Sequence, residues 1–253
     1  KAFSHAYLNV YSHRDENEAA RAVNLIRKAI QPLLQEYEKA AVKILDLCCG
    51  QGRYSMLLAE EGYNVVGLDL SKDLLAVADQ RWKVAGASGA DNSGRLRLVR
   101  ADMRRIPFVD AFHVMINMFT SFGYFDRDSD NQAVLDTSAR ALHNRGRFMI
   151  DYLNRDQVLK NLVGEDDSEI EGLTLRQSRR ISQDGLRVEK NVQVTGPEGE
   201  DSYNESVRLY SLSEMETMLD HSGFSLEEVF GDYDCSAWSA ESPRLIMIGS
   251  KNG

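Results

Sequence analysis

The chain is short of cysteine and proline, with three of the first and four of the second among 253 residues. Because Cys48 and Cys49 are adjacent, the cysteines cannot build a disulfide framework, and their odd number leaves a free thiol. This usage is typical of a reducing cytoplasm, where we expect the protein to work. No apolar run approaches the roughly 18 residues of a membrane-spanning helix, and residues 1–11 lack the apolar core of a signal peptide.

Basic residues are also scarce relative to acidic ones. The 30 Lys and Arg face 39 Asp and Glu, which gives a net charge of −9. A surface that neutralises nucleic-acid phosphates needs a basic balance, so this composition argues against a nucleic-acid partner. The rest of the composition, 43% hydrophobic and 27% charged, is that of an ordinary globular protein. A chain of this length can bury enough apolar surface to fold without a disulfide or a metal.

Between residues 42 and 152, short apolar runs with strand character alternate with helical patterns. The predicted strands are 42–48, 64–70, 96–101, 111–117 and 147–152, and the predicted helices are 53–61, 71–85 and 128–143. A helix at 213–222, capped by Ser213, and strands at 224–230 and 245–248 continue the pattern later in the chain. Strands that alternate with helices predict an α/β fold with a parallel sheet covered on both faces.

A different pattern interrupts this alternation after Asn154. Three strand-like runs at 173–182, 185–195 and 202–211 are separated by turn signals, which favour an antiparallel meander. We interpret the acidic segment Glu165–Asp167 as a solvated loop that leads into it. The predicted parts are therefore an N-terminal arm and helix (1–40), a main domain (41–164 and 212–253) and a β insertion (165–211) that covers the substrate. We expect Pro32 to kink or end the first helix.

The segment from Ile44 to Arg53 carries the most informative motif, because a strand ends there in small residues and a helix begins. Asp46 lies near the strand end, and the turn reads Cys48-Cys49-Gly50-Gln51-Gly52. Glycine lets a ligand approach the backbone, and open α/β sheets bind ligands beyond the carboxyl ends of their strands. The next strand ends in Asp69, where a carboxylate can accept both hydroxyls of a ribose. These features predict an adenosine-containing cofactor.

Two cofactors fit this pattern. Gly50-x-Gly52-x-x-Ser55 and its spacing to Asp69 would suit NAD. Asp46 favours S-adenosylmethionine, because its carboxylate could receive the ammonium group of that cofactor and would repel a pyrophosphate. The third strand ends in Ala101-Asp102-Met103, which offers a carboxylate for an adenine amino group and an apolar side chain for the ring.

Five segments in order resemble the motifs of class I S-adenosylmethionine-dependent methyltransferases. They are Asp46–Gly52, with Cys48 where many members have Gly or Ala, then Val66–Ser71, Ala101–Arg104, Asn117–Tyr124 and Ala141–Phe148. The resemblance implies a Rossmann-like, doubly wound seven-stranded sheet with a small antiparallel β insertion. It also implies S-adenosylmethionine as cofactor, with S-adenosylhomocysteine as product. The cofactor-binding residues that it implies are Tyr11, Arg14, Asp46, Cys48, Cys49, Gly50, Gly52, Asp69, Leu70, Ala101, Asp102, Met103, Asn117 and Met118.

Within this superfamily the chain looks most like the glycine and amino-sugar N-methyltransferases, which also carry an N-terminal arm with tyrosines and a β insertion. By that likeness Tyr11 closes over the cofactor and Arg14 binds its carboxylate. In the amino-sugar enzymes a His assists near the position of Tyr124, so the Tyr found here puts a dedicated general base in question. We expect Tyr124 and Tyr11 to orient the reactants, and Ser121, Tyr124 and Tyr203 to line the acceptor site.

The prediction is therefore methyl transfer to a small molecule, at an amine nitrogen. An RNA or protein methyltransferase is an alternative. The acidic balance argues against RNA, as does Asn117-Met118-Phe119-Thr120, which stands where an Asn/Asp-Pro-Pro-aromatic tetrad would be expected. An oxidoreductase that binds NAD and a non-catalytic protein that binds S-adenosylmethionine stay open as well.

Metal and membrane partners are not expected. Adjacent cysteines without a second Cys/His cluster favour small packing residues over a metal site. Asp126-x-Asp128-x-Asp130 lacks the later Gly and Glu of a calcium loop. Strand edges of the insertion could pair in a homodimer.

Overall fold

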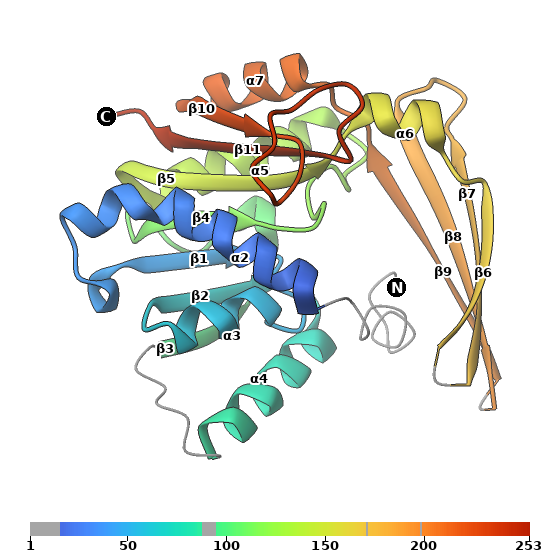
Figure 1. The fold of residues 1–253 in the computed structure, drawn as a ribbon, viewed down its shortest axis with the longest axis horizontal. Coiled ribbons are helices and arrows are strands. Elements are labelled where there is room, and N and C mark those ends of the chain that lie inside the picture. The colour runs from blue at the N-terminus through green and yellow to red at the C-terminus, as the bar shows by residue number, and fades with distance from the viewer. Residues whose placement is uncertain (1–15, 88–94, 171, 198) are drawn as a thin grey trace.

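The computed structural model describes residues 16–253 apart from 88–94, 171 and 198 (Figure 1). Tyr11 and Arg14, predicted to bind the cofactor, lie outside the described residues, so those two predictions stay untested. Within the described part of the chain, no helix is both long and apolar enough to span a membrane.

A seven-stranded sheet forms the centre of the molecule, with strand order β10-β11-β5-β4-β1-β2-β3. Its strands are β1 (Lys43–Leu47), β2 (Asn64–Asp69), β3 (Arg95–Arg100), β4 (Phe112–Asn117), β5 (Leu142–Leu153), β10 (Phe224–Phe230) and β11 (Arg244–Lys251). Strands β1 to β5 are parallel, while β11 is antiparallel to both β5 and β10. The direction of winding reverses between β1 and β4, and such a switch point is where open α/β sheets bind ligands. The fold class predicted from the sequence is confirmed.

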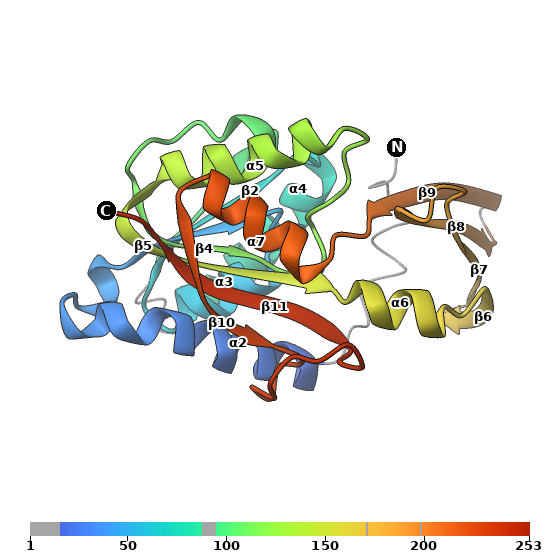
Figure 2. The same ribbon diagram turned by 90° about the horizontal axis from the view of Figure 1, so that it is seen from above.

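Helices cover both faces of this sheet (Figures 1 and 2). They are α2 (Glu16–Ile30), α3 (Arg53–Glu60), α4 (Lys72–Ala87), α5 (Asp128–Ala141) and α7 (Leu212–His221), with short 3-10 helices at Gln31–Gln35, Lys39–Ala41 and Met103–Arg105. A further helix, α6 (Arg155–Asn161), lies beyond the end of β5 and leads into the insertion. Side chains alternate along a strand, so Ile44 packs in one core with α2 and α3, and Leu45 packs in the other with α5 and α7. This packing makes the sheet a rigid support for the loops at its carboxyl edge.

The end of one helix and the start of another can be compared with the predictions. Helix α2 ends at Ile30, and Pro32 lies in the 3-10 turn that follows, as predicted. The cap of α7 is Ser211 rather than the predicted Ser213. The Ser211 hydroxyl accepts from the Glu214 amide, and the Glu214 side chain accepts from the Ser211 amide, which makes a capping box. A Glu at the third helical position thus selects the earlier serine.

The insertion is a separate antiparallel sheet of four strands. They are β6 (Glu165–Ile170), β7 (Leu173–Ile181), β8 (Arg187–Gly196) and β9 (Gly199–Arg208), in that order. The strands predicted at 173–182, 185–195 and 202–211 correspond to β7, β8 and β9, whereas the solvated loop predicted at Glu165–Asp167 is wrong. This acidic segment is an edge strand, because β7 places Arg179 beside Asp166 and Arg176 beside Asp167. Cross-strand cations offset the charge that made the segment look like a loop.

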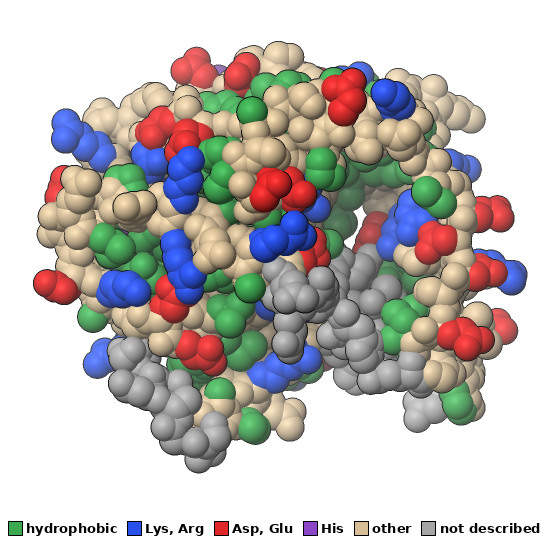
Figure 3. All heavy atoms as spheres, in the orientation of Figure 1, with side chains coloured by type: hydrophobic (Ala, Val, Ile, Leu, Met, Phe, Trp, Pro, Cys, Tyr) green, Lys and Arg blue, Asp and Glu red, His purple; other side chains and the backbone are tan. Residues whose placement is uncertain are grey.

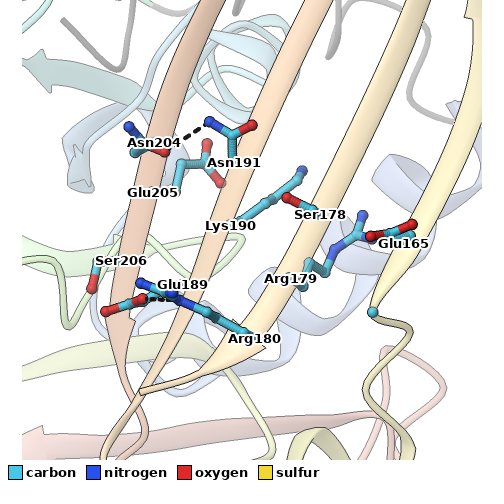
Figure 4. A pocket seen from close by; sticks show the side chains of 11 residues that line it. Glu165, Ser178, Arg179, Arg180, Glu189, Lys190, Asn191, Asn204, Glu205 and Ser206 are labelled. Atoms are coloured by element: carbon cyan, nitrogen blue, oxygen red, sulfur yellow. Dashed lines mark hydrogen bonds and ion pairs between the residues drawn. The ribbon is translucent and has the colours of Figure 1, made fainter. Parts of the chain in front are cut away.

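The two faces of the insertion differ in polarity. Leu175, Val192, Val194 and Tyr203 form a small buried cluster on one face. The other face carries a hollow of about 660 Å³, lined by side chains such as Ser178, Asn191, Asn204 and the ion pair of Arg180 with Glu189 (Figure 4). The lining residues all lie between 164 and 206 and include none from the carboxyl ends of the strands of the large sheet, so we do not place the candidate site in this hollow.

Candidate functional site

The turn after β1 presents its backbone to the crevice between β1 and β4. Cys48 and Gly50 both have positive φ, 62° and 54°. For Cys48 this conformation is uncommon, and such outliers cluster at functional sites. Within the described part of the chain, a Cβ added to Gly50 would have Leu74 Cδ1, at 4.0 Å, as its nearest contact, so no described residue crowds the space in front of Gly50. A ligand can therefore approach the backbone here.

Asp69, at the end of β2, lies against this turn. Its carboxylate accepts the amide of Gly50 at 2.9 Å and the amide of Ser71 at 2.8 Å. Burial raises the pKa of Asp69, and these two hydrogen bonds act in the opposite direction. The next residue, Leu70, is 58% exposed, which is unusual for a large apolar side chain beside a buried strand end. A carboxylate and an apolar surface thus lie side by side at the edge of the turn.

Asp46 is buried beneath the same turn, with 1% of its surface exposed. The hydroxyl of Ser55 donates to Asp46 Oδ2 at 2.5 Å. Burial raises the pKa of Asp46 to about 7, despite this hydrogen bond. The carboxyl group is therefore divided between its neutral and charged forms near neutral pH, and a cationic ligand would favour the charged form.

Asn117, at the end of β4, spans the crevice. Its side-chain amide donates to the carbonyl oxygen of Leu47 at 3.0 Å. Its Oδ1 atom is buried and has no hydrogen-bond partner within the described part of the chain. Buried polar atoms are nearly always paired, so an orphaned acceptor at a strand switch point indicates a ligand donor. Met118 follows directly and is buried in the core beside α2 and α3.

The end of β3 contributes Ala101, Asp102 and Met103. The Asp102 carboxylate forms a two-pronged ion pair with Arg104, whose hydrogen bonds lower the pKa of Asp102. An adenine amino group would have to share this carboxylate with Arg104. Met103 lies against the turn after β1, where its sulfur accepts from the Cys48 thiol at 3.4 Å.

The adjacent cysteines behave as packing residues. Burial raises the pKa of Cys48 and of Cys49 well above the ordinary value, so neither is a thiolate near neutral pH. Cys49 packs against Gly67 of β2, where an added Cβ would come within 2.8 Å of its sulfur. Among the described residues, no group of three or more His, Cys, Asp or Glu is arranged to hold a metal ion.

The predicted acceptor residues come from two places. Ser121 and Tyr124 lie in the loop between β4 and α5, where Ser121 donates to the Met118 carbonyl oxygen at 2.9 Å. Tyr124 is half-buried beside the second core. Tyr203 is buried in the apolar cluster of the insertion rather than in that core. The structure therefore places Ser121 and Tyr124 in one loop of the main domain, whereas Tyr203 belongs to the sheet of the insertion.

Sequence reasoning missed Arg187, which joins the insertion to this loop. From β8, its guanidinium donates to the carbonyl oxygens of Phe125 (3.0 Å), Gly123 (3.3 Å) and Tyr124 (3.4 Å). It also donates to the Ser206 carbonyl at 2.9 Å. Nothing local to residue 187 indicates its contacts with the loop, because these three partners lie about sixty residues away in the chain.

Residues 44–146 match the methyltransferase-domain family. YqeM of Bacillus subtilis (strain 168), provisionally named a methyltransferase, is 27% identical over 219 residues, which are 83% of this chain and 84% of YqeM. The dTDP-3-amino-3,6-dideoxy-alpha-D-glucopyranose N,N-dimethyltransferase of Streptomyces fradiae is 25% identical over 201 residues, which are 77% of this chain and 74% of that enzyme.

The fold has a close structural counterpart. The crystal structure of an S-adenosylmethionine-dependent methyltransferase from Clostridium acetobutylicum ATCC 824 superposes with a TM-score of 0.80. The match covers 99% of this chain and 98% of that one, at 17% sequence identity.

The sheet order and the glycine turn beside Asp69 are features of α/β folds that bind nucleotide cofactors. The match of residues 44–146 to the methyltransferase-domain family bears out the resemblance to class I S-adenosylmethionine-dependent methyltransferases, and the superposition shows the same fold.

Proposed function

We propose that the protein transfers a methyl group to an amine nitrogen of a small molecule. The orphaned Oδ1 of Asn117, buried between the glycine turn and the loop that carries Tyr124, is the observation that most directly supports a ligand in this crevice. The amine is supported by the name of the Streptomyces fradiae relative, which acts on an amino sugar. Over the described part of the face in Figure 3, acidic and basic side chains are interspersed rather than gathered into the basic track that RNA binding favours.

The residues at the crevice suit S-adenosylmethionine. Asp69 would accept the ribose hydroxyls, Leu70 and Met103 would contact the adenine ring, and Asp46 would face the ammonium group. The open space before Gly50 and the orphaned oxygen of Asn117 fit such an occupant. When bound, the cofactor supplies a methyl group on a positively charged sulfur.

The remaining predicted residues have simpler tasks in this proposal. Cys48, Cys49, Gly52 and Ala101 would shape the backbone around the cofactor. Tyr124 and Tyr11 would orient the acceptor, Ser121 and Tyr203 would line its pocket, and Arg14 would bind the cofactor carboxylate. An amine loses its proton to solvent before attack, so orientation and exclusion of water account for most of what the protein must do.

Calorimetry with S-adenosylmethionine, S-adenosylhomocysteine and NADH tests the cofactor. We expect micromolar binding of the first two and no heat from NADH. Formation of S-adenosylhomocysteine should then be measured with glycine, sarcosine and a dTDP-3-amino sugar, using the matching hydroxy compounds as controls. Turnover on a hydroxy compound, an RNA or a peptide, but on no amine, would contradict the amine proposal. Heat from NADH alone would favour an oxidoreductase.

Cofactor binding should depend on pH through Asp46. Its folded pKa of about 7 lies above the ordinary value of 3.8, so the ligand-free protein binds the extra proton, and its stability decreases as pH rises between these two values. An ammonium group needs the carboxylate, so affinity for S-adenosylmethionine should rise about eightfold between pH 6.0 and 7.5, following the charged fraction. Isothermal titration across this range measures the effect.

Asp46→Asn is the variant that tests this assignment. It keeps an oxygen that can accept from Ser55 but does not titrate, so we expect weaker binding with no dependence on pH in that range. Asp220→Asn, an exposed position on α7, should keep the full dependence on pH. The assignment to Asp46 is wrong if the two variants show the same pH profile.

A further inference from the structure

Phe119 and Thr120, which follow Met118, have a backbone conformation that L residues seldom adopt. Their φ angles are 58° and 56°. The left-handed region brings Cβ close to the carbonyl oxygen, and a β-branched residue such as Thr is especially disfavoured there. Two such residues in succession persist only where the surrounding structure imposes the conformation.

Asp151, near the carboxyl end of β5, provides two acceptors for this turn. The Phe119 amide donates to Asp151 Oδ2 at 2.8 Å, and the Thr120 amide donates to the Asp151 carbonyl oxygen at 2.9 Å. Asp151 is completely buried. Hydrogen bonds to a buried carboxylate are stronger than neutral ones, so this residue can stabilise an unfavourable backbone.

Asp151 is in turn held by β11 and by the loop that precedes it. Arg244 Nε donates to Asp151 Oδ1, and the Tyr233 hydroxyl donates to Oδ2 at 2.6 Å. Arg244 also donates to Thr120 Oγ1 at 3.4 Å, and its guanidinium lies 5.2 Å from the centre of the Phe119 ring. Burial and the nearby carboxylate raise the pKa of Tyr233, so its hydroxyl remains a donor.

We propose that Asp151, Arg244 and Tyr233 form a clamp that sets the Phe119–Thr120 turn, and that Arg244 is thereby a positioning residue for methyl transfer. Both carboxylate oxygens of Asp151 accept hydrogen bonds, so this group positions the turn rather than acting as a base. The inference rests on the proposed function, which places the acceptor beside the loop that continues from this turn.

The clamp acts on the acceptor side of the crevice rather than on the cofactor side. Asn117 is fixed independently, by its bond to Leu47 and by the pairing of β4 with β1 and β5. Loss of the clamp should therefore leave cofactor affinity unchanged. The loop with Ser121 and Tyr124, which follows the turn directly, should instead lose its fixed position.

Hydrogen exchange tests the clamp without any acceptor. In Arg244→Met, we expect the amides of Phe119 and Thr120 to exchange roughly tenfold faster or more than in the unmodified chain. Arg244→Lys keeps a cation, and Tyr233→Phe keeps the ion pair of Arg244 with Asp151, so both should show smaller increases in the exchange rate. If Arg244→Met does not fold, these two variants test the clamp in its place. Arg180→Met, which removes an exposed ion pair of the insertion, is the matched control and should leave these amides unchanged.

Kinetics test the positioning role. With the amine that the unmodified chain methylates, Arg244→Met should lower kcat roughly tenfold or more, while KM for S-adenosylmethionine and calorimetric affinity for S-adenosylhomocysteine change little. Glycine adopts positive φ without strain, so Thr120→Gly added to Arg244→Met should restore part of the lost kcat. Asp126→Gly, in the same loop but outside the turn, should restore none.

Each outcome decides a separate claim. Unchanged exchange in all three clamp variants would overturn the clamp. If exchange becomes faster but kcat is unchanged, Arg244 has no positioning role. The same conclusion follows if cofactor affinity and kcat fall in parallel and Thr120→Gly restores neither. If the unmodified chain binds no S-adenosylhomocysteine, the proposed function fails, and the exchange rates still show whether the clamp holds the turn.

Discussion

Asp69→Ala should raise the Kd for S-adenosylmethionine roughly 10- to 150-fold, which corresponds to about 1.5–3 kcal/mol for hydrogen bonds to a charged group. The carboxylate lies at the end of β2 and accepts the Gly50 amide, so its removal would take away the proposed ribose acceptor and also release the turn after β1. Isothermal titration gives the Kd directly, and thermal unfolding shows that the variant folds.

Two further variants separate these contributions. Asp69→Asn keeps an oxygen for the Gly50 amide but loses the charge, so its Kd should lie between those of the unmodified chain and the Ala variant. Asp73→Ala removes the same charge from an exposed position in the first turn of α4 and should change the Kd less than twofold, within the ordinary range for surface substitutions. Equal affinity in the Asp69 variants and the unmodified chain would refute the ribose assignment.

Arg187→Met should lower kcat/KM for the amine acceptor by roughly 10- to 150-fold, the range expected for loss of charge-assisted hydrogen bonds. This guanidinium holds three successive carbonyl groups of the loop that carries Tyr124, and it comes from the insertion. Methionine keeps much of the side-chain volume but has no donor. Without these bonds the insertion and the loop can move independently, so the acceptor loses its orientation.

The affinity for S-adenosylhomocysteine should stay the same in Arg187→Met, because in this loop Arg187 bonds to Gly123, Tyr124 and Phe125 and not to the residues proposed to hold the cofactor. Arg180→Met, on the neighbouring strand β7, loses only an exposed ion pair with Glu189 and should keep normal turnover. A fall in cofactor affinity as large as the fall in kcat/KM would mean that Arg187 supports the whole fold rather than the acceptor loop.

The principal sheet could be predicted because its signals are local. Alternating apolar runs and helical patterns between 42 and 152 predict parallel strands, and all parallel strands end at the same edge. Asp46, Gly50, Asp69 and Asn117 could therefore be placed together from their positions at strand ends alone. Strand β6 could not be predicted in this way, because its acidic residues are typical of a solvated loop until the fold pairs them with Arg176 and Arg179.

The acceptor side of the crevice depends on contacts that no local pattern encodes. Asp151 and Arg244 are 93 residues apart, and only the pairing of β11 with β5 brings them together around the Phe119–Thr120 turn. Arg187 likewise acquires its partners through the fold of the insertion. The amino-acid sequence by itself determined the class of fold and the sheet edge at which we propose the cofactor, since both follow from periodicity along the chain. Tertiary structure alone decided which side chains hold the loop that carries Tyr124, because a side chain's hydrogen-bond partners depend on where distant strands meet.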